Sequence, residues 1–241
     1  VPVELVIAEN AREYPEAERI NAFIRDEADN FRGAPGFDWG FFGLDSEYKE
    51  EVIEDVPDNY QRIRRSHFTE VGEFYAITRH NYGELSLGDY HWERRFIYSF
   101  DDFRRLAEAP RQKRSFNTSA YREAREKQDD RGITITGIQH PLGKLVRQAT
   151  MEEVYIWLFT EKETTHRFLD NCTQQIIESV LTLENSDLQP VFATSAYEML
   201  IPPWMGMTAL RELVFRYDKA MNGAIHRIGG LLRARCHGMG G

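Results

Sequence analysis

The sequence contains little cysteine and no long apolar segment, and both shortages exclude whole classes of protein. Its 241 residues include two cysteines, Cys172 and Cys236, too few for the disulfide framework of a small secreted domain. No apolar run approaches the ~20 residues that a helix needs to cross a bilayer. The first ten residues contain Glu4 and Glu9 and lack the basic flank of a signal peptide. We therefore expect a cytoplasmic protein with no membrane partner.

The sequence also lacks a cluster of basic residues. Lysine and arginine number 30 against 39 acidic residues, which gives a formal net charge of -9. The densest basic stretch, 111–125, is interleaved with or followed closely by Glu123, Glu126, Asp129 and Asp130, as in a solvated surface. Because a nucleic-acid site needs a concentrated basic face, we expect no nucleic-acid partner.

What the sequence does contain is a series of segments with helical or strand patterning. Apolar residues three and four apart predict helices, and short apolar or β-branched runs between turn residues predict strands. The acidic segment 47–59 is expected to form a loop or a surface helix. The expected helices span 16–30, 99–110, 152–159, 164–183 and 208–228, and the expected strands 3–7, 37–44, 68–78, 91–98, 132–139, 189–194 and 231–236.

Two of these helices carry capping signals. Ser99 is a candidate N-cap, followed by Asp101 and Asp102 in the first turn, where the helix dipole favours acidic residues. Gly229 follows the helix over 208–228 and is a candidate C-cap.

The order of the predicted elements indicates an α/β fold. Strands and helices alternate from residue 132 onward, which predicts parallel βαβ units with right-handed crossovers. Both a doubly wound sheet and a barrel fit this alternation. The strands between 68 and 98 are separated by short turns and are expected to pair antiparallel.

Five motifs follow one another in an order that resembles the uroporphyrinogen decarboxylase superfamily, from about Arg62 onward. The resemblance implies a single domain over 1–241. It also implies a TIM-type (β/α) barrel with an antiparallel hairpin insertion, incomplete at its C-terminus, and an active site at the carboxyl ends of the strands. The motifs are Thr69-Glu70-Val71-Gly72, Arg95-Phe96-Ile97 before Ser99-Phe100-Asp101-Asp102, Ser195-Ala196-Tyr197-Glu198 before Pro202-Pro203-Trp204, Tyr217-Asp218-Lys219 before Ile228-Gly229-Gly230, and Arg235-Cys236-His237-Gly238.

Four candidate functional residues follow expected strands. Gln139 and His140 come at the end of the strand over 132–139 and are candidates for binding a cofactor. Tyr197 and Glu198 follow the strand over 189–194, where a carboxylate could act as a general acid or base. Both His140 and Glu198 could instead have a purely structural role, as a cap or a loop contact.

His237 is the leading catalytic candidate, because it ends the last predicted strand beside Gly238. The resemblance to the zinc-dependent methyltransferase branch implies that His237, with Cys236, contributes to a zinc site that would activate a thiol substrate. The chain departs from that motif, since Arg235 stands in place of its first histidine and the further downstream cysteine is absent. Adjacent strand residues also point to opposite faces.

Three functions stay open on the sequence alone. The first is methyl transfer between an acceptor and either a methylated small molecule or a corrinoid carried by a partner protein. The second is cofactor-free decarboxylation of a tetrapyrrole, which predicts several arginines around the cavity. The third is a non-catalytic partial barrel that binds another molecule or forms a homo-oligomer, which predicts an exposed apolar surface.

Overall fold

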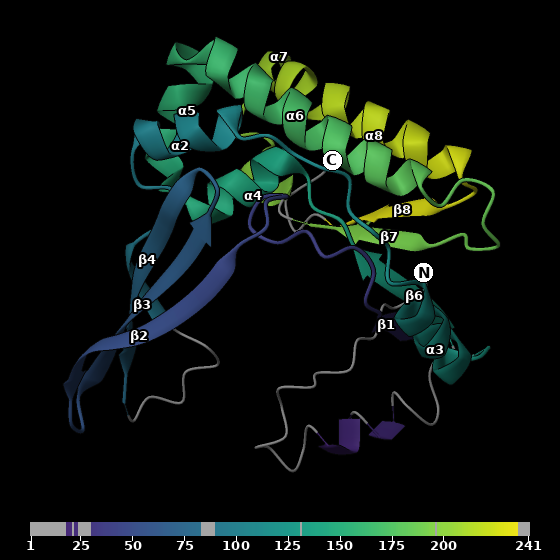
Figure 1. Cartoon of the computed structure of the whole chain (residues 1–241), viewed down its shortest axis with the longest axis horizontal. Helices are drawn as coiled ribbons and strands as arrows, with labels where there is room; N and C mark the ends of the chain where they lie inside the picture. The colour runs from purple at the N-terminus through teal and green to yellow at the C-terminus, as the bar shows by residue number, and fades with distance from the viewer. Residues whose placement is uncertain are drawn as a thin grey trace.

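The computed structural model describes residues 18–20, 22–23, 30–82, 90–130, 132–195 and 197–235. These residues form a mixed α/β structure with one parallel and one antiparallel sheet, both bordered by a layer of helices (Figure 1). The predicted strand over 3–7 and most of the predicted helix over 16–30 lie outside the described residues. Within the described ranges, no helix is long and apolar enough to cross a membrane.

The parallel sheet confirms the predicted βαβ pattern. Its four strands lie in the order β1-β6-β7-β8, and every neighbouring pair is parallel. Three of them were predicted, whereas β1 begins at the end of the helix predicted over 16–30. All four carboxyl ends therefore lie at the same edge. The strands are β1 (Asn30–Gly33), β6 (Gly132–Gly137), β7 (Val191–Thr194) and β8 (Leu231–Ala234).

Helices cover one face of this sheet. The covering helices α3 (Thr118–Gln128), α6 (Lys162–Leu181) and α8 (Arg216–Arg227) enclose a core around Phe192, which is fully buried. Side chains on the opposite face are much more exposed, with Ile133 at 45% and Leu231 at 61%. The predicted helix over 208–228 is confirmed as a continuous helix of three parts: α7 (Met207–Leu210), the π-helical η3 (Arg211–Phe215) and α8. Among the described residues the strands do not close into a barrel.

The antiparallel sheet is larger than the sequence predicted. Its strands lie in the order β2-β3-β4-β5, and a turn at 70–71 separates β3 from β4, where one strand over 68–78 was expected. The prediction of a loop or surface helix over 47–59 was wrong, because 47–56 forms β2. The strands are β2 (Glu47–Val56), β3 (Tyr60–Thr69), β4 (Gly72–Asn81) and β5 (Tyr90–Arg94).

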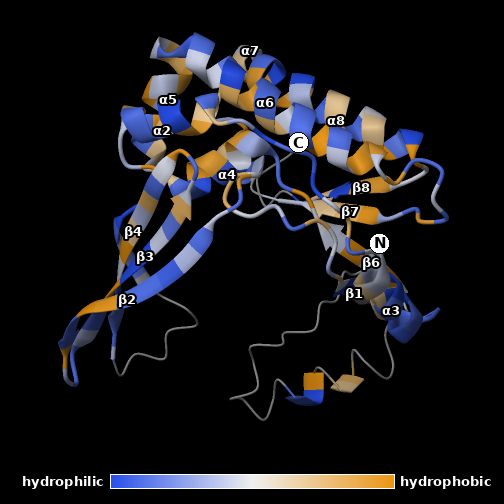
Figure 2. Cartoon of the chain, viewed as in Figure 1, coloured by the Kyte–Doolittle hydropathy of each residue, from blue (hydrophilic) through white to orange (hydrophobic). Residues whose placement is uncertain are grey.

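Cross-strand ion pairs explain why so acidic a segment is a strand. Glu50 on β2 lies 2.7 Å from Arg65 on β3, and Glu54 lies 3.0 Å from Arg62. Such opposite-charge pairs stabilise adjacent strands. Figure 2 shows hydrophilic residues along much of β2 and β3. The arginines of β3, which lie opposite the glutamates of β2, are therefore the sequence signal for this strand pair. An apolar pattern within β2 is not.

The segment 37–44 is a succession of turns, so its prediction as a strand was wrong. Phe37, Phe41 and Phe42 are buried as expected of a core segment. However, Gly40 and Gly43 have φ values of 49° and 87°, which are incompatible with an extended strand. The apolar run thus packs into the core as a compact loop.

The helices beside the antiparallel sheet follow the predicted capping. Ser99 Oγ accepts a hydrogen bond from Asp102 N at 3.2 Å, and the Asp102 carboxylate accepts one from Ser99 N at 3.1 Å. This capping box starts α2 (Phe100–Glu108), which ends two residues before Pro110. Two further helices, α4 (Pro141–Gln148) and α5 (Met151–Thr160), follow β6 in the chain and pack in the same core as α2.

Candidate functional site

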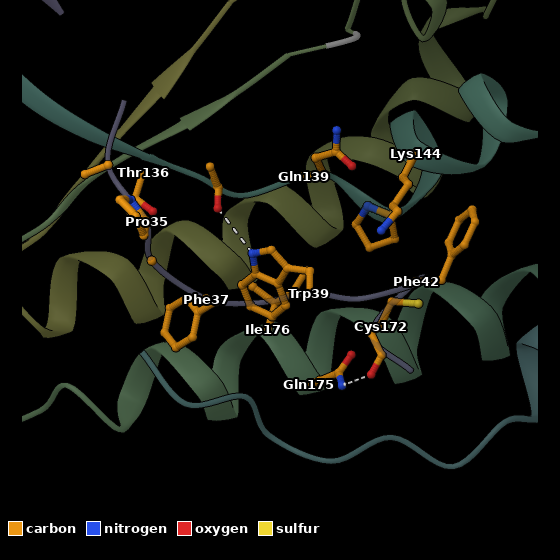
Figure 3. Close-up of a pocket in the computed structure, with 15 residues that line it drawn as sticks. Pro35, Phe37, Trp39, Phe42, Thr136, Gln139, Lys144, Cys172, Gln175 and Ile176 are labelled. Atoms are coloured by element: carbon orange, nitrogen blue, oxygen red, sulfur yellow. Dashed lines mark hydrogen bonds between the residues drawn. The ribbon is translucent and has the colours of Figure 1, made fainter. Parts of the chain in front are cut away.

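The carboxyl ends of β1 and β6 border a cavity of about 370 Å³. Segments 34–36 and 136–139, at these strand ends, form one side of it. The loop after β1 contributes Phe37, Trp39 and Phe42, and helices α4 and α6 close the remainder (Figure 3). This edge of a parallel α/β sheet is where such folds bind ligands, because the loops there vary without disturbing the core. The volume is that of a site for a small molecule.

The loop after β1 is held against the end of β6. Trp39 Nε1 donates a hydrogen bond to the Gly137 carbonyl at 3.2 Å, and the Phe37 and Trp39 ring centroids are 4.9 Å apart. Gly36 lies so close that a Cβ there would be 2.0 Å from Thr136 Oγ1, so the residue must be glycine. The buried Gln175 of α6 donates to the Gly43 carbonyl at 2.7 Å. Hydrogen bonds to the end of β6 and from α6 therefore hold the aromatic wall of the cavity in place.

Lys144 is the only charged residue among the described residues that line this cavity. Its Nζ donates a hydrogen bond to the Gly40 carbonyl at 3.2 Å and lies 5.0 Å from the centroid of the Phe42 ring. Burial lowers the pKa of Lys144 to about 8, an effect that the nearby Cys172 and Asp38 oppose. No described carboxylate forms an ion pair with it. An ammonium group thus faces a largely apolar cavity with no described carboxylate in ion-pair contact.

Cys172 of α6 also lines the cavity and is 6% exposed. Burial raises the pKa of its thiol, which Arg111 and Lys144 only partly oppose. Because the thiolate is the reactive form of cysteine, a raised pKa makes Cys172 a poor nucleophile.

Gln139 and His140, both predicted to bind a cofactor, lie in different surroundings in the structure. Gln139 lines the cavity, as expected of a residue at the strand end. His140 is 1% exposed and caps α4, since its Nδ1 accepts a hydrogen bond from Leu142 N at 3.1 Å. His140 therefore has the capping role that the sequence left open as an alternative. Its role in binding a cofactor stays a prediction.

His140 and Tyr197 meet in a second place, around Asp218 of α8. The Tyr197 hydroxyl donates to Asp218 Oδ1 at 2.8 Å, and His140 Nε2 lies 3.9 Å from the same oxygen. Burial lowers the pKa of His140 to about 4 and raises that of Asp218 to about 6. Burial and the Asp218 carboxylate together raise the pKa of Tyr197. At neutral pH the cluster therefore consists of a neutral imidazole, a phenol and a carboxylate.

Glu198 lies apart from its neighbour Tyr197. It lines a larger groove of about 750 Å³ between β5 and helices α4 and α5. Its Oε2 is buried and has no hydrogen-bond partner among the described residues. Three glutamates line this groove and balance its three arginines, Arg94, Arg95 and Arg147. Glu198 thus lies in a groove that Tyr197 does not line, and the catalytic role of each residue stays a prediction.

The metal-binding candidates Cys236 and His237 lie outside the described residues. The described chain ends just after β8, where Arg235 N donates to the Thr194 carbonyl at 2.8 Å, at the same edge as the cavity. Across the described ranges, no group of three or more histidine, cysteine, aspartate or glutamate side chains could hold a metal ion. These residues therefore do not by themselves fit a zinc site.

We compared the chain with protein-family models, with curated proteins and with solved structures. No match was found. The choice among functions therefore depends on the cavity and on the sequence motifs.

Sequence reasoning missed Lys144 and Asp218 as functional candidates. Lys144 follows His140 by four residues, so it lies one helical turn from the strand end, and this spacing is the signal that could have found it. Asp218 appeared only inside a motif. Its position beside Tyr197 depends on how α8 docks on the sheet, which no local pattern encodes.

Proposed function

We propose that the chain is an enzyme that transfers a methyl group to or from a small molecule bound at the carboxyl ends of β1 and β6. The observation that carries this proposal is the apolar cavity of about 370 Å³ at that edge. It has the size of a small-molecule site and the position of the active site in (β/α) barrels. The five motifs similar to the uroporphyrinogen decarboxylase superfamily support the choice of reaction.

We also propose that the parallel sheet is part of a (β/α) barrel. Parallel sheets are almost always covered on both faces, and here helices cover one. In a barrel, the other face is the inner surface, filled by side chains from all strands. Ile133 and Leu231 are apolar side chains of the face that no described helix covers. The four consecutive parallel neighbours are consistent with one arc of such a barrel.

The charges around the two cavities favour methyl transfer over tetrapyrrole decarboxylation. A substrate with several carboxylates needs several converging cations. The smaller cavity offers Lys144 alone, and the arginines of the larger groove are matched by Glu93, Glu152 and Glu198. A small molecule with a transferable methyl group, in contrast, needs an apolar site that excludes water from the reacting atoms.

The chain's own residues would bind and orient the substrate. Phe37 and Trp39 form an apolar wall, and Gln139 offers an amide that can donate and accept hydrogen bonds. Since Cys172 is held as a neutral thiol, the methyl acceptor comes from outside these residues. A corrinoid on a partner protein would supply the methyl group in an activated form. We assign no step to zinc, because the described residues do not form a site for it.

The test is methyl transfer from methylcobalamin to 2-mercaptoethanol. Loss of the methylcobalamin absorbance and the S-methyl product, detected by mass spectrometry, would report turnover. We expect Trp39→Ala to lower the rate about 10-fold or more, because the substrate loses one wall and its orientation. Trp204→Ala is the matched control, since Trp204 is 57% exposed and lies outside the cavity. A wild-type rate equal to that of buffer, or an unchanged rate in Trp39→Ala, would count against the proposal.

A further inference from the structure

We infer that this cavity selects small molecules that carry one carboxylate group on an apolar body, and that Lys144 is the residue that recognises the carboxylate. The inference deepens the proposed function, because it names the substrate class of the same cavity. Nevertheless, it concerns binding and can be tested without turnover.

The first argument is the unsatisfied charge of Lys144. An ammonium group has three N–H donors, and the one hydrogen bond that the structure gives Lys144 is to the Gly40 carbonyl at 3.2 Å. Lys144 is half-buried, and a charged group that is partly withdrawn from water is usually paired with an opposite charge. Figure 3 shows the Lys144 side chain directed into the space between Phe42 and Trp39. A ligand carboxylate there would supply the missing counter-ion.

The second argument is that the charged neighbours of Lys144 have other partners. Arg114 pairs with Asp45 and also donates to the Gly43 carbonyl. Asp38 accepts a hydrogen bond from Gly40 N at 2.9 Å and forms no ion pair with Lys144. Burial, together with the nearby Lys144 ammonium, lowers the pKa of His67 to about 4, so the imidazole is neutral. Cys172 is a neutral thiol. The Lys144 ammonium therefore has no ion-pair partner in contact among the described residues, although the Asp38 carboxylate lies near it.

The third argument is the rest of the lining, which is apolar. Phe37, Trp39 and Ile176 provide rings and an aliphatic chain, and no second cation is present among the described lining residues. A dicarboxylate or a phosphate would bring more negative charge than one ammonium balances. A neutral ligand would leave Lys144 unpaired. An aromatic or branched monocarboxylate matches both the charge and the walls.

Isothermal titration calorimetry with three matched probes tests this inference. Benzoate, benzamide and benzylamine share one ring and differ in the charge of the substituent. We expect benzoate to bind the wild-type chain at least 10-fold more tightly than benzamide, and benzylamine to show no binding. In Lys144→Met, benzoate affinity should fall about 10- to 100-fold, as for loss of one charged hydrogen bond. Lys144→Arg should retain part of the preference for benzoate.

Lys113→Met is the control, because Lys113 is exposed and lies outside the cavity lining. It should bind benzoate as the wild type does, and circular dichroism should show that both methionine variants are folded. Equal affinity for benzoate and benzamide, or unchanged benzoate affinity in Lys144→Met, would overturn the inference. Benzoate binding that depends on Lys144, without any methyl transfer, would support the inference and count against the proposed function.

Discussion

Burial sets the ionisation of three side chains at the carboxyl edge of the parallel sheet: Lys144, His140 and Asp218. Each departs from its ordinary pKa in the direction that favours the neutral form. Groups with such shifts gather at functional sites more often than elsewhere. They also make the cavity and the cluster beside it accessible to simple pH experiments.

Binding of benzoate should weaken as the pH rises through about 8. Lys144 loses its proton in that range because burial lowers its pKa, whereas the carboxylate stays ionised throughout. Above this pKa, the affinity should fall about tenfold per pH unit. Lys144→Arg should remove the dependence, since a guanidinium stays charged. Calorimetric titrations between pH 6 and 10 would check this, and a flat wild-type profile would contradict it.

His140 and Asp218 should have opposite effects on stability between about pH 4 and 6. The folded state holds the proton of Asp218 more tightly than the unfolded chain, so ionising Asp218 lowers the free energy of unfolding as pH rises from 3.8 to about 6. The folded state resists protonation of His140, so that stability rises with pH from about 4 to 6.5. The two slopes therefore largely cancel in the wild type.

Single variants should expose each slope. Asp218→Asn should leave a free energy of unfolding that increases with pH, and His140→Asn, which keeps an N-cap side chain, one that decreases. Each change should reach at most about 3 kcal/mol, the value of two pKa units. Urea denaturation at several pH values measures both. The same sign of slope in the two variants would show that the two groups do not titrate as described.

The sequence identified some residues of the candidate site but not their partners. His140, Tyr197 and Gln139 were identifiable because they follow strands, and the structure places all three near the carboxyl edge. Their partners Lys144 and Asp218 lie on helices. A helix brings a residue to a site through its rotation and docking, and neither is set by the residue's immediate neighbours.

Among the helices and strands, α2 is an example of an element whose start the local sequence predicts. Ser99 and Asp102 form the capping box that the sequence indicated, and the helix begins where they predict. Segments 47–59 and 37–44 were mispredicted for complementary reasons. The first is polar but gains its strand from charge pairs with β3. The second is apolar but is kept from extending by Gly40 and Gly43. Pairing with β3 therefore determines the conformation of the first segment, and the backbone conformation of two glycines determines that of the second.

The capping box can be tested directly. Ser99→Ala should lower the free energy of unfolding by about 1 kcal/mol, because Asp102 N loses its acceptor. Ser115→Ala is a suitable control, since Ser115 is exposed and lies in the segment between α2 and α3. It should change stability by less than about 0.5 kcal/mol. Chemical denaturation of the two variants would separate these effects, and equal losses would contradict the capping role.

On the scale of the whole molecule, the sequence predicted parallel βαβ units and an antiparallel insertion, and both are present. Periodicity does not distinguish a barrel from an open sheet, because both use the same local alternation of strands and helices. The distinction depends on what covers the sheet face that carries Ile133 and Leu231.

The barrel proposal predicts that the apolar part of this face, where Phe31 and Ile133 are adjacent, does not tolerate a negative charge. Ile133→Glu should destabilise the chain by about 2 kcal/mol or more, since it would place a carboxylate among apolar side chains on the inner surface of a barrel. Ile156→Glu is the control, because Ile156 is 53% exposed on the outside of α5. It should cost less than about 0.5 kcal/mol. Equal, small effects of the two changes in thermal unfolding would argue for an open sheet.

The most direct measurement of the central claim is the reactivity of Lys144 toward an amine reagent. Brief acetylation over a range of pH, followed by peptide mass spectrometry, gives the pKa of each lysine. We predict a value near 8 for Lys144, and strong protection of Lys144 alone by benzoate, with the exposed Lys113 as the reference lysine. If Lys144 reacts as Lys113 does, and benzoate leaves its reaction unchanged, the cavity is not the anion-recognising site described here.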